Sequence, residues 1–138
     1  MWDRPERTFG GVIAYLQLPD AKAAAELYRK AFDAKEIDRR PVEDGRLMHC
    51  HLEINGGALM FSDQFPEYGM SAKAVEGVTL HIASLDPQSW WDRAVAAGLE
   101  VVHPLKVEFW GDTYGQLRDP FGITWGIVGP AGEDKAKG

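Results

Sequence analysis

A stretch that occurs twice decides the fold: VIAYLQLPD at residues 12–20 and VTLHIASLD at residues 78–86. Each copy begins with a short run that predicts a half-buried strand, and it ends in an aspartate that can cap a helix. These aspartates, Asp20 and Asp86, lie 66 positions apart, and the residues after them predict helices over 21–32 and 87–97. A supersecondary unit repeated at a constant offset indicates two related modules.

Three further strand candidates follow each helix. They cover residues 35–41, 47–54 and 58–62 in the first module, and 99–102, 114–118 and 123–128 in the second. The last strand opens at a glycine 37 residues after the first cap and 36 residues after the second. The sequence therefore predicts an α+β fold of two β-α-β-β-β modules in one domain over 1–138. The modules cover about 10–63 and 77–129, with a connector at about 64–76 and a loose polar tail at about 130–138.

Composition narrows the classes of function. The balance of 15 Lys and Arg against 21 Asp and Glu gives a net charge of −6, which disfavours nucleic acid and anionic membrane surfaces. The lone Cys50 excludes an intramolecular disulfide and fits a reducing compartment. The first residues have no apolar signal region, and no apolar run approaches the roughly 20 residues of a membrane span. We expect a cytoplasmic protein that binds a small molecule, with no nucleic-acid or membrane partner.

Several strings resemble one known family, the vicinal oxygen chelate superfamily of glyoxalase I, bleomycin-resistance proteins and extradiol dioxygenases. They are Leu18-Pro19-Asp20-Ala21, Phe109-Trp110-Gly111-Asp112 with Tyr114-Gly115, and Asp119-Pro120-Phe121-Gly122-Ile123-Thr124-Trp125. The resemblance covers about residues 10–130 and points to the PhnB-like branch. It implies that each module forms half of a concave cleft with its helix on the convex side, and that two copies of the chain form a homodimer.

Strand alternation then assigns side chains to the cleft. The even-numbered residues of 12–18 and 48–54 are the apolar set that faces the helix, so the odd-numbered ones face the cleft, and the same parity sends His81 inward. Trp110 and Tyr114 flank Gly111 and either pack as a structural turn or offer flat walls to a planar ligand. The predicted ligand-binding residues are Tyr15, Gln17, His49, His51, Glu53, His81, Trp110 and Tyr114.

The metal site of the superfamily is not expected. By the resemblance, the ligand positions of metal-dependent relatives fall here on Ile13, Met60, Thr79 and Gly126. None of these suits a hard or borderline cation, because isoleucine has no donor, a methionine sulfur is soft and a single threonine hydroxyl is weak. No cofactor is therefore predicted. A divalent metal elsewhere, held by His51, Glu53 and His81, stays open as a weaker alternative.

The histidines themselves admit two interpretations. His49 and His51 are either ordinary strand residues hydrogen-bonded to neighbours, or members of a polar patch with Glu53 and His81 that orients a ligand or acts as acid and base. Asp63, Glu67 and Tyr68 belong to the segment that is a candidate lid or cleft rim.

The first functional hypothesis is a metal-independent protein of the glyoxalase and bleomycin-resistance type that binds a small molecule in the cleft. The alternative is a metal-dependent lyase, isomerase or dioxygenase that acts on vicinal oxygens, with Glu53 or a histidine as base. A third class, a binding subunit for a protein partner, predicts an apolar patch at the cleft mouth. Whether the chain is an enzyme stays open, and no catalytic residue is assigned.

Overall fold

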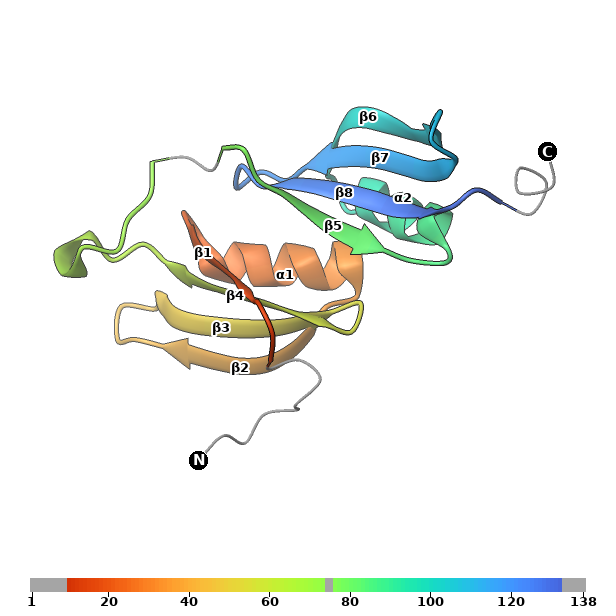
Figure 1. Cartoon of the computed structure of the whole chain (residues 1–138). Coiled ribbons are helices and arrows are strands. Elements are labelled where there is room, and N and C mark those ends of the chain that lie inside the picture. The colour runs from red at the N-terminus through yellow and green to blue at the C-terminus, as the bar shows by residue number, and fades with distance from the viewer. Residues whose placement is uncertain (1–9, 74–75, 133–138) are drawn as a thin grey trace. The chain divides into compact units, whose positions relative to one another are not determined.

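The computed structural model describes residues 10–73 and 76–132, which fold into two compact units, one within Met1–Lys73 and one within Ala74–Gly138 (Figure 1). Within the described residues, each unit has one α-helix and one four-stranded sheet. Of the helices in these ranges, none has both the length and the apolar character that crossing a membrane requires.

The first unit follows the predicted order of elements. These are β1 (Ala14–Leu18), α1 (Ala21–Phe32), β2 (Lys35–Pro41), β3 (Leu47–Ile54) and β4 (Gly57–Asp63), followed by a short 3-10 helix η2 (Pro66–Tyr68). Strand β4 pairs in parallel with β1 and antiparallel with β3, and the sheet order is β1-β4-β3-β2. The long crossover through α1 to β2 is what allows β1 and β4 to run in parallel.

The second unit repeats the same arrangement. Its elements are β5 (Thr79–Ala83), α2 (Pro87–Ala96), β6 (Glu100–Val107), β7 (Asp112–Arg118) and β8 (Thr124–Pro130), and the sheet order is β5-β8-β7-β6. Strand β8 pairs in parallel with β5 and antiparallel with β7. The predicted α+β fold of two β-α-β-β-β modules is confirmed.

Both helices begin where the sequence places a cap. The Asp20 side chain accepts a hydrogen bond from the Ala23 N–H at 3.1 Å, and the Asp86 side chain accepts one from the Ser89 N–H at 3.3 Å. Each bond satisfies a helix N–H that has no partner within the helix. Because α1 has its apolar stripe on one side, it buries Tyr28 and Phe32 against the sheet.

Each unit has its core between its helix and its sheet. In the first unit, Tyr28 packs edge-on against Phe61 of β4, and Cys50 of β3 is fully buried on the same side. In the second unit the core includes Trp91 of α2 and Trp125 of β8. Cys50 and Trp125 are therefore core residues, as their strand positions predict.

Some boundaries differ from the sequence expectation. Strand β1 begins at Ala14 instead of Val12, which is fully exposed. Strand β6 extends to Val107, well beyond the predicted residue 102, with register shifts on both sides of His103. The next residue, Pro104, has no N–H to donate to the hydrogen bonds between strands, which accounts for the shifts in pairing register. The alternation of residue types along the strand does not predict such shifts.

Asp63 is a correction to the expectation that it belongs to a lid or rim. It is the last residue of β4 and is buried, and its carboxylate accepts hydrogen bonds from the Ala21 N–H at 2.8 Å and the Leu47 N–H at 2.6 Å. Asp63 therefore ties the starts of α1 and β3 to the end of β4. Glu67, in η2, pairs with Arg46 at 2.6 Å, which attaches the segment after β4 to the turn between β2 and β3.

Candidate functional site

The side of each sheet opposite that unit's own helix, here called the helix-free face, carries the predicted site residues that lie on strands, whereas Trp110 lies in the turn before β7. In β3, Cys50 and Leu52 point to the buried helix side, so alternation places His49, His51 and Glu53 on the helix-free face. In β7, a Cβ on Gly115 would meet Trp91 of α2, so the neighbouring positions face the other way. The faces predicted from strand period are those that the sheets adopt.

Tyr15 and His49 meet on the helix-free face of the first unit. The Tyr15 hydroxyl oxygen lies 3.1 Å from His49 Nδ1, and the two rings stack with centroids 5.7 Å apart. The same hydroxyl lies within 3.4 Å of the Met48 carbonyl oxygen. Burial raises the pKa of the Tyr15 phenol, and a hydrogen bond with Ser62 opposes that rise. At neutral pH the pair therefore presents a neutral phenol beside an imidazole.

His81 and Tyr114 meet on the helix-free face of the second unit. His81 Nε2 lies 3.5 Å from the Tyr114 hydroxyl oxygen, and Gln116 Nε2 donates to that oxygen at 2.9 Å. The Trp110 ring is tilted against Tyr114 with centroids 6.1 Å apart, and Phe109 packs edge-on against Trp110. The result is a hydrogen-bonded group beside an exposed aromatic surface.

The repeat relates the two pairs, with the residue types exchanged. Tyr15 is paired in register with Met60, and His81 with Gly126, the residue at the corresponding place in β8. In both units the partner residue is on the third strand of the module, two residues before the residue directly in register (His51 or Gln116): it is His49 in β3 and Tyr114 in β7. Each unit thus has a tyrosine–histidine contact on the same diagonal of its sheet.

The other predicted site residues are placed as follows. Gln17 lies on β1 and is half-buried, whereas His51 and Glu53 on β3 are buried, with exposed fractions of 0% and 8%. The structure brings Tyr15 together with His49, and His81 together with Tyr114 and Trp110. Because these two groups belong to different units, the convergence of all eight residues on one cleft stays a prediction.

The residues at the positions where the resemblance implies metal ligands do not fit a hard or borderline cation. A Cβ on Gly126 would lie 2.6 Å from His81 Cδ2 and 3.1 Å from Tyr114 Cε1, so the His81–Tyr114 pair occupies the space that a ligand side chain would need. Met60, at the corresponding place in β4, offers only a soft thioether. Across residues 10–73 and 76–132, no group of three or more His, Cys, Asp and Glu side chains is positioned to hold a metal.

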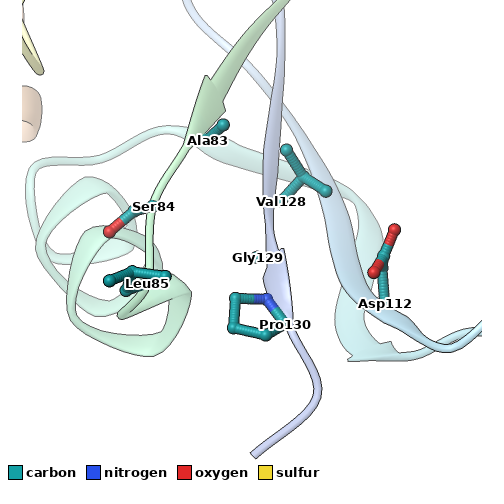
Figure 2. A pocket seen from close by; sticks show the side chains of 7 residues that line it. All are labelled: Ala83, Ser84, Leu85, Asp112, Val128, Gly129 and Pro130. Atoms are coloured by element: carbon teal, nitrogen blue, oxygen red, sulfur yellow. The ribbon is translucent and has the colours of Figure 1, made fainter.

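A shallow cavity of about 340 Å³ lies at the edge of the second unit, around the end of β8 (Figure 2). Its lining is mostly apolar, with one carboxylate, and consists of Ala83, Ser84, Leu85, Asp112, Val128, Gly129 and Pro130. None of the predicted site residues belongs to it. The sequence does not reveal it because its walls come from the ends of strands that only tertiary pairing brings together.

Gln116 is a site residue that the sequence reasoning missed. It follows Tyr114 by two positions in β7 and so lies on the same face. Strand alternation could have placed Gln116 on this face. It could not have identified Tyr114 as the hydrogen-bond partner, because that bond depends on how Tyr114 is oriented towards β5.

Comparison with known proteins agrees with this geometry. The family model for the Glyoxalase/Bleomycin resistance protein/Dioxygenase superfamily matches residues 11–127. An uncharacterized protein of Mycobacterium tuberculosis is 39% identical over 125 residues, which cover 86% of this chain and 74% of that protein. Two solved structures share the fold. TioX from Micromonospora sp. ML1 has a TM-score of 0.73 at 22% identity and covers 88% of this chain and 99% of its own. The PhnB protein from Bacillus cereus has a TM-score of 0.64 at 14% identity, and the match covers 87% of this chain and 99% of the PhnB chain.

Proposed function

The chain belongs to the Glyoxalase/Bleomycin resistance protein/Dioxygenase superfamily, and from this premise we propose that it binds a small organic molecule without the metal that other members use. The observation that carries the proposal is the tyrosine–histidine contact on the helix-free face of each unit, Tyr15 with His49 and His81 with Tyr114. Partly exposed polar groups that contact each other beside aromatic rings are suited to orienting a ligand.

The surroundings of the pairs favour a flat ligand with polar oxygen or nitrogen atoms. Tyr15 and Trp110 are about half exposed, at 48% and 52%, so their rings are available for stacking. The imidazoles and hydroxyls beside them can donate or accept hydrogen bonds. We place Gln17, His51 and Glu53 in the same ligand-binding surface, because they share the face of Tyr15.

The absence of a metal from the mechanism rests on side-chain chemistry. Gly126 has no donor, and the space beside it is taken by His81, while Met60 supplies sulfur in place of oxygen or nitrogen. A ligand would therefore be held by hydrogen bonds and stacking. We further propose that the protein acts in the cytoplasm as a homodimer. We also propose that it has neither nucleic acid nor a membrane as partner, and its net charge of −6 supports this second point.

The test combines ligand screening with variants of both pairs. Aromatic acids, amides and amines would be screened by ligand-observed NMR against the full chain and against Tyr15→Phe, His49→Ala and Tyr114→Phe. Binding should weaken in these variants and persist in Tyr68→Phe, whose side chain is exposed on η2, outside both pairs. Hits that survive all three site variants would exclude the proposed surface.

A metal measurement separates this proposal from a metal-dependent lyase, isomerase or dioxygenase. Protein purified without chelator would be analysed for Ni, Zn, Fe and Mn. A stoichiometric metal that is lost in His51→Ala would overturn the metal-independent proposal. Ligand binding that is unchanged by exhaustive chelation would support it.

A further inference from the structure

The hydrogen bond between Gln116 and Tyr114 has a chemical consequence for His81. Gln116 donates through its amide nitrogen to the Tyr114 hydroxyl oxygen at 2.9 Å. The phenol has a single proton, and with Gln116 as donor that proton is directed to its other neighbour, His81 Nε2, at 3.5 Å. A nitrogen that accepts a hydrogen bond is unprotonated, so the proton of the neutral imidazole lies on Nδ1.

We propose that Gln116 is a positioning residue that directs the Tyr114 proton towards His81 and so keeps His81 as an Nδ1–H donor. This inference rests on the small-molecule site proposed above and specifies the ligand chemistry at its second-unit end. The His81 side chain is exposed, so its N–H is available to a ligand. The matching group on the ligand is a carbonyl, carboxylate or phenolate oxygen.

The strand register limits this arrangement to the second unit. Gln116 and His81 are both paired with Gly126, from opposite sides of β8, and Gly126 has no side chain of its own between them. The corresponding residue in the first unit is His51, which is paired with Met60 as Gln116 is with Gly126. The amide nitrogen of a glutamine is always a hydrogen-bond donor, whereas a given imidazole nitrogen is a donor in one tautomer and an acceptor in the other. At this position, therefore, the second unit has a side chain that always donates and the first unit does not.

The tautomer of His81 can be measured directly by two-bond ¹H–¹⁵N NMR on the full chain at pH 8.5, where ordinary imidazoles are neutral. In the native protein we expect the Nδ1–H form. Gln116→Glu places a carboxylate that accepts the Tyr114 proton, so Tyr114 must accept from His81 and the tautomer changes to Nε2–H. Gln116→Met removes the directing donor and should give a mixture of both forms.

Gln88→Glu is the matched control, because it introduces the same charge on an exposed position of α2. It should leave the His81 tautomer unchanged. An Nε2–H tautomer in the native protein overturns the proposal, as does an unchanged Nδ1–H tautomer in Gln116→Glu. If Gln116→Glu does not fold, retention of pure Nδ1–H in Gln116→Met overturns it instead.

The ligand class is tested with benzoate and benzylamine, which share a ring and differ in hydrogen-bonding character. Benzoate should shift the His81 and Tyr114 resonances, with affinity about twofold weaker in the uncharged Gln116→Met variant, because only about half of its His81 then has the Nδ1–H form. Benzylamine should not shift them. Shifts with benzylamine, or with neither probe, overturn the acceptor class.

The two proposals fail in different ways. The tautomer is measured without ligand, so an incorrect tautomer with intact ligand binding refutes the role of Gln116 alone. The expected tautomer, combined with no binding of any screened compound to either unit, refutes the proposed function.

Discussion

The imidazole of His81 occupies the space that a side chain on Gly126 would need. A Cβ at position 126 would lie 2.6 Å from His81 Cδ2 and 2.9 Å from His81 Nε2. Gly126 therefore allows His81 to lie over β8 and to reach Tyr114 on the next strand. The same glycine has no side-chain donor at a position where the family resemblance implies a metal ligand, so one residue both makes room for the pair and lacks the donor.

Gly126→Ala should displace His81 and break its contact with Tyr114. We expect the free energy of unfolding to fall by about 1–3 kcal/mol, the usual cost of overpacking, and ligand binding to be lost. Urea denaturation measures the first effect. The double variant Gly126→Ala/His81→Ala should recover the stability but not the binding.

Gly57→Ala is the control, because its Cβ would lie at an ordinary 3.6 Å from the Ile54 carbonyl oxygen. Equal losses in both glycine variants would contradict the steric explanation.

Tyr15→Phe should remove the hydrogen bond to His49 while keeping the ring in place. The expected loss in unfolding free energy is about 0.5–1.5 kcal/mol, measured by urea denaturation, with a change in the ¹⁵N shifts of His49. Tyr68→Phe is the matched control, because Tyr68 is 68% exposed. If the two substitutions have the same effect on His49, the Tyr15–His49 contact is not present in solution.

Cys50 should make the protein less stable at alkaline pH. Burial raises the pKa of its thiol from 9.0 to about 12. The unfolded thiol ionises first, so its contribution to stability is complete below pH 9 and is lost as the pH rises towards 12. Cys50→Ala should flatten the fall in stability between pH 9 and pH 12. A thiol reagent at pH 7 should modify the native protein only as fast as it unfolds, and rapid labelling would refute the burial of Cys50.

Asp119 should be more important for stability than its position in a turn suggests. It is buried and accepts hydrogen bonds from the N–H groups of Phe121 and Ile123 and from the Trp125 indole at 2.9 Å. Asp119→Ala leaves buried donors without this acceptor and should cost about 3 kcal/mol.

Asp119→Asn separates the contributions of the two oxygens. It keeps one oxygen for the backbone and sets an amide N–H against the indole, so the cost should be about 1–2 kcal/mol. Tryptophan fluorescence during urea denaturation measures both variants. The exposed Asp92→Asn on α2 serves as control. An Asp119→Ala variant as stable as the control would show that the indole contact contributes nothing.

Much of the fold could be read from local pattern. The bounds of α1, β2 and β3 coincide with those expected from the Asp20 cap, the apolar stripe and strand alternation. These signals are local because a cap or a hydrophobic period involves residues within a few positions of one another. Alternation also assigned His49 and His81 to the sheet face opposite the helix, whereas it was not applied to Tyr114.

The contacts within the site depended on pairing between distant strands. Tyr15 meets His49 because β1 pairs in parallel with β4 and β4 pairs with β3, a register that the period of a single strand cannot specify. Asp63 looked like a residue of an exposed connector, yet the end of β4 lies beside the starts of α1 and β3, which bury its carboxylate.

The sequence by itself therefore determined the repeated β-α-β-β-β order, the helix starts and the residues on each sheet face, since all of these follow from short-range spacing. Tertiary structure decided that each sheet pairs a tyrosine with a histidine on the same diagonal, with the two residue types at opposite ends in the two units. It also decided that Gln116 bonds to Tyr114 and that the imidazole of His81 fits over Gly126. Such contacts cross strands far apart in the chain, so the side chains acquire their partners only when the sheet register is formed.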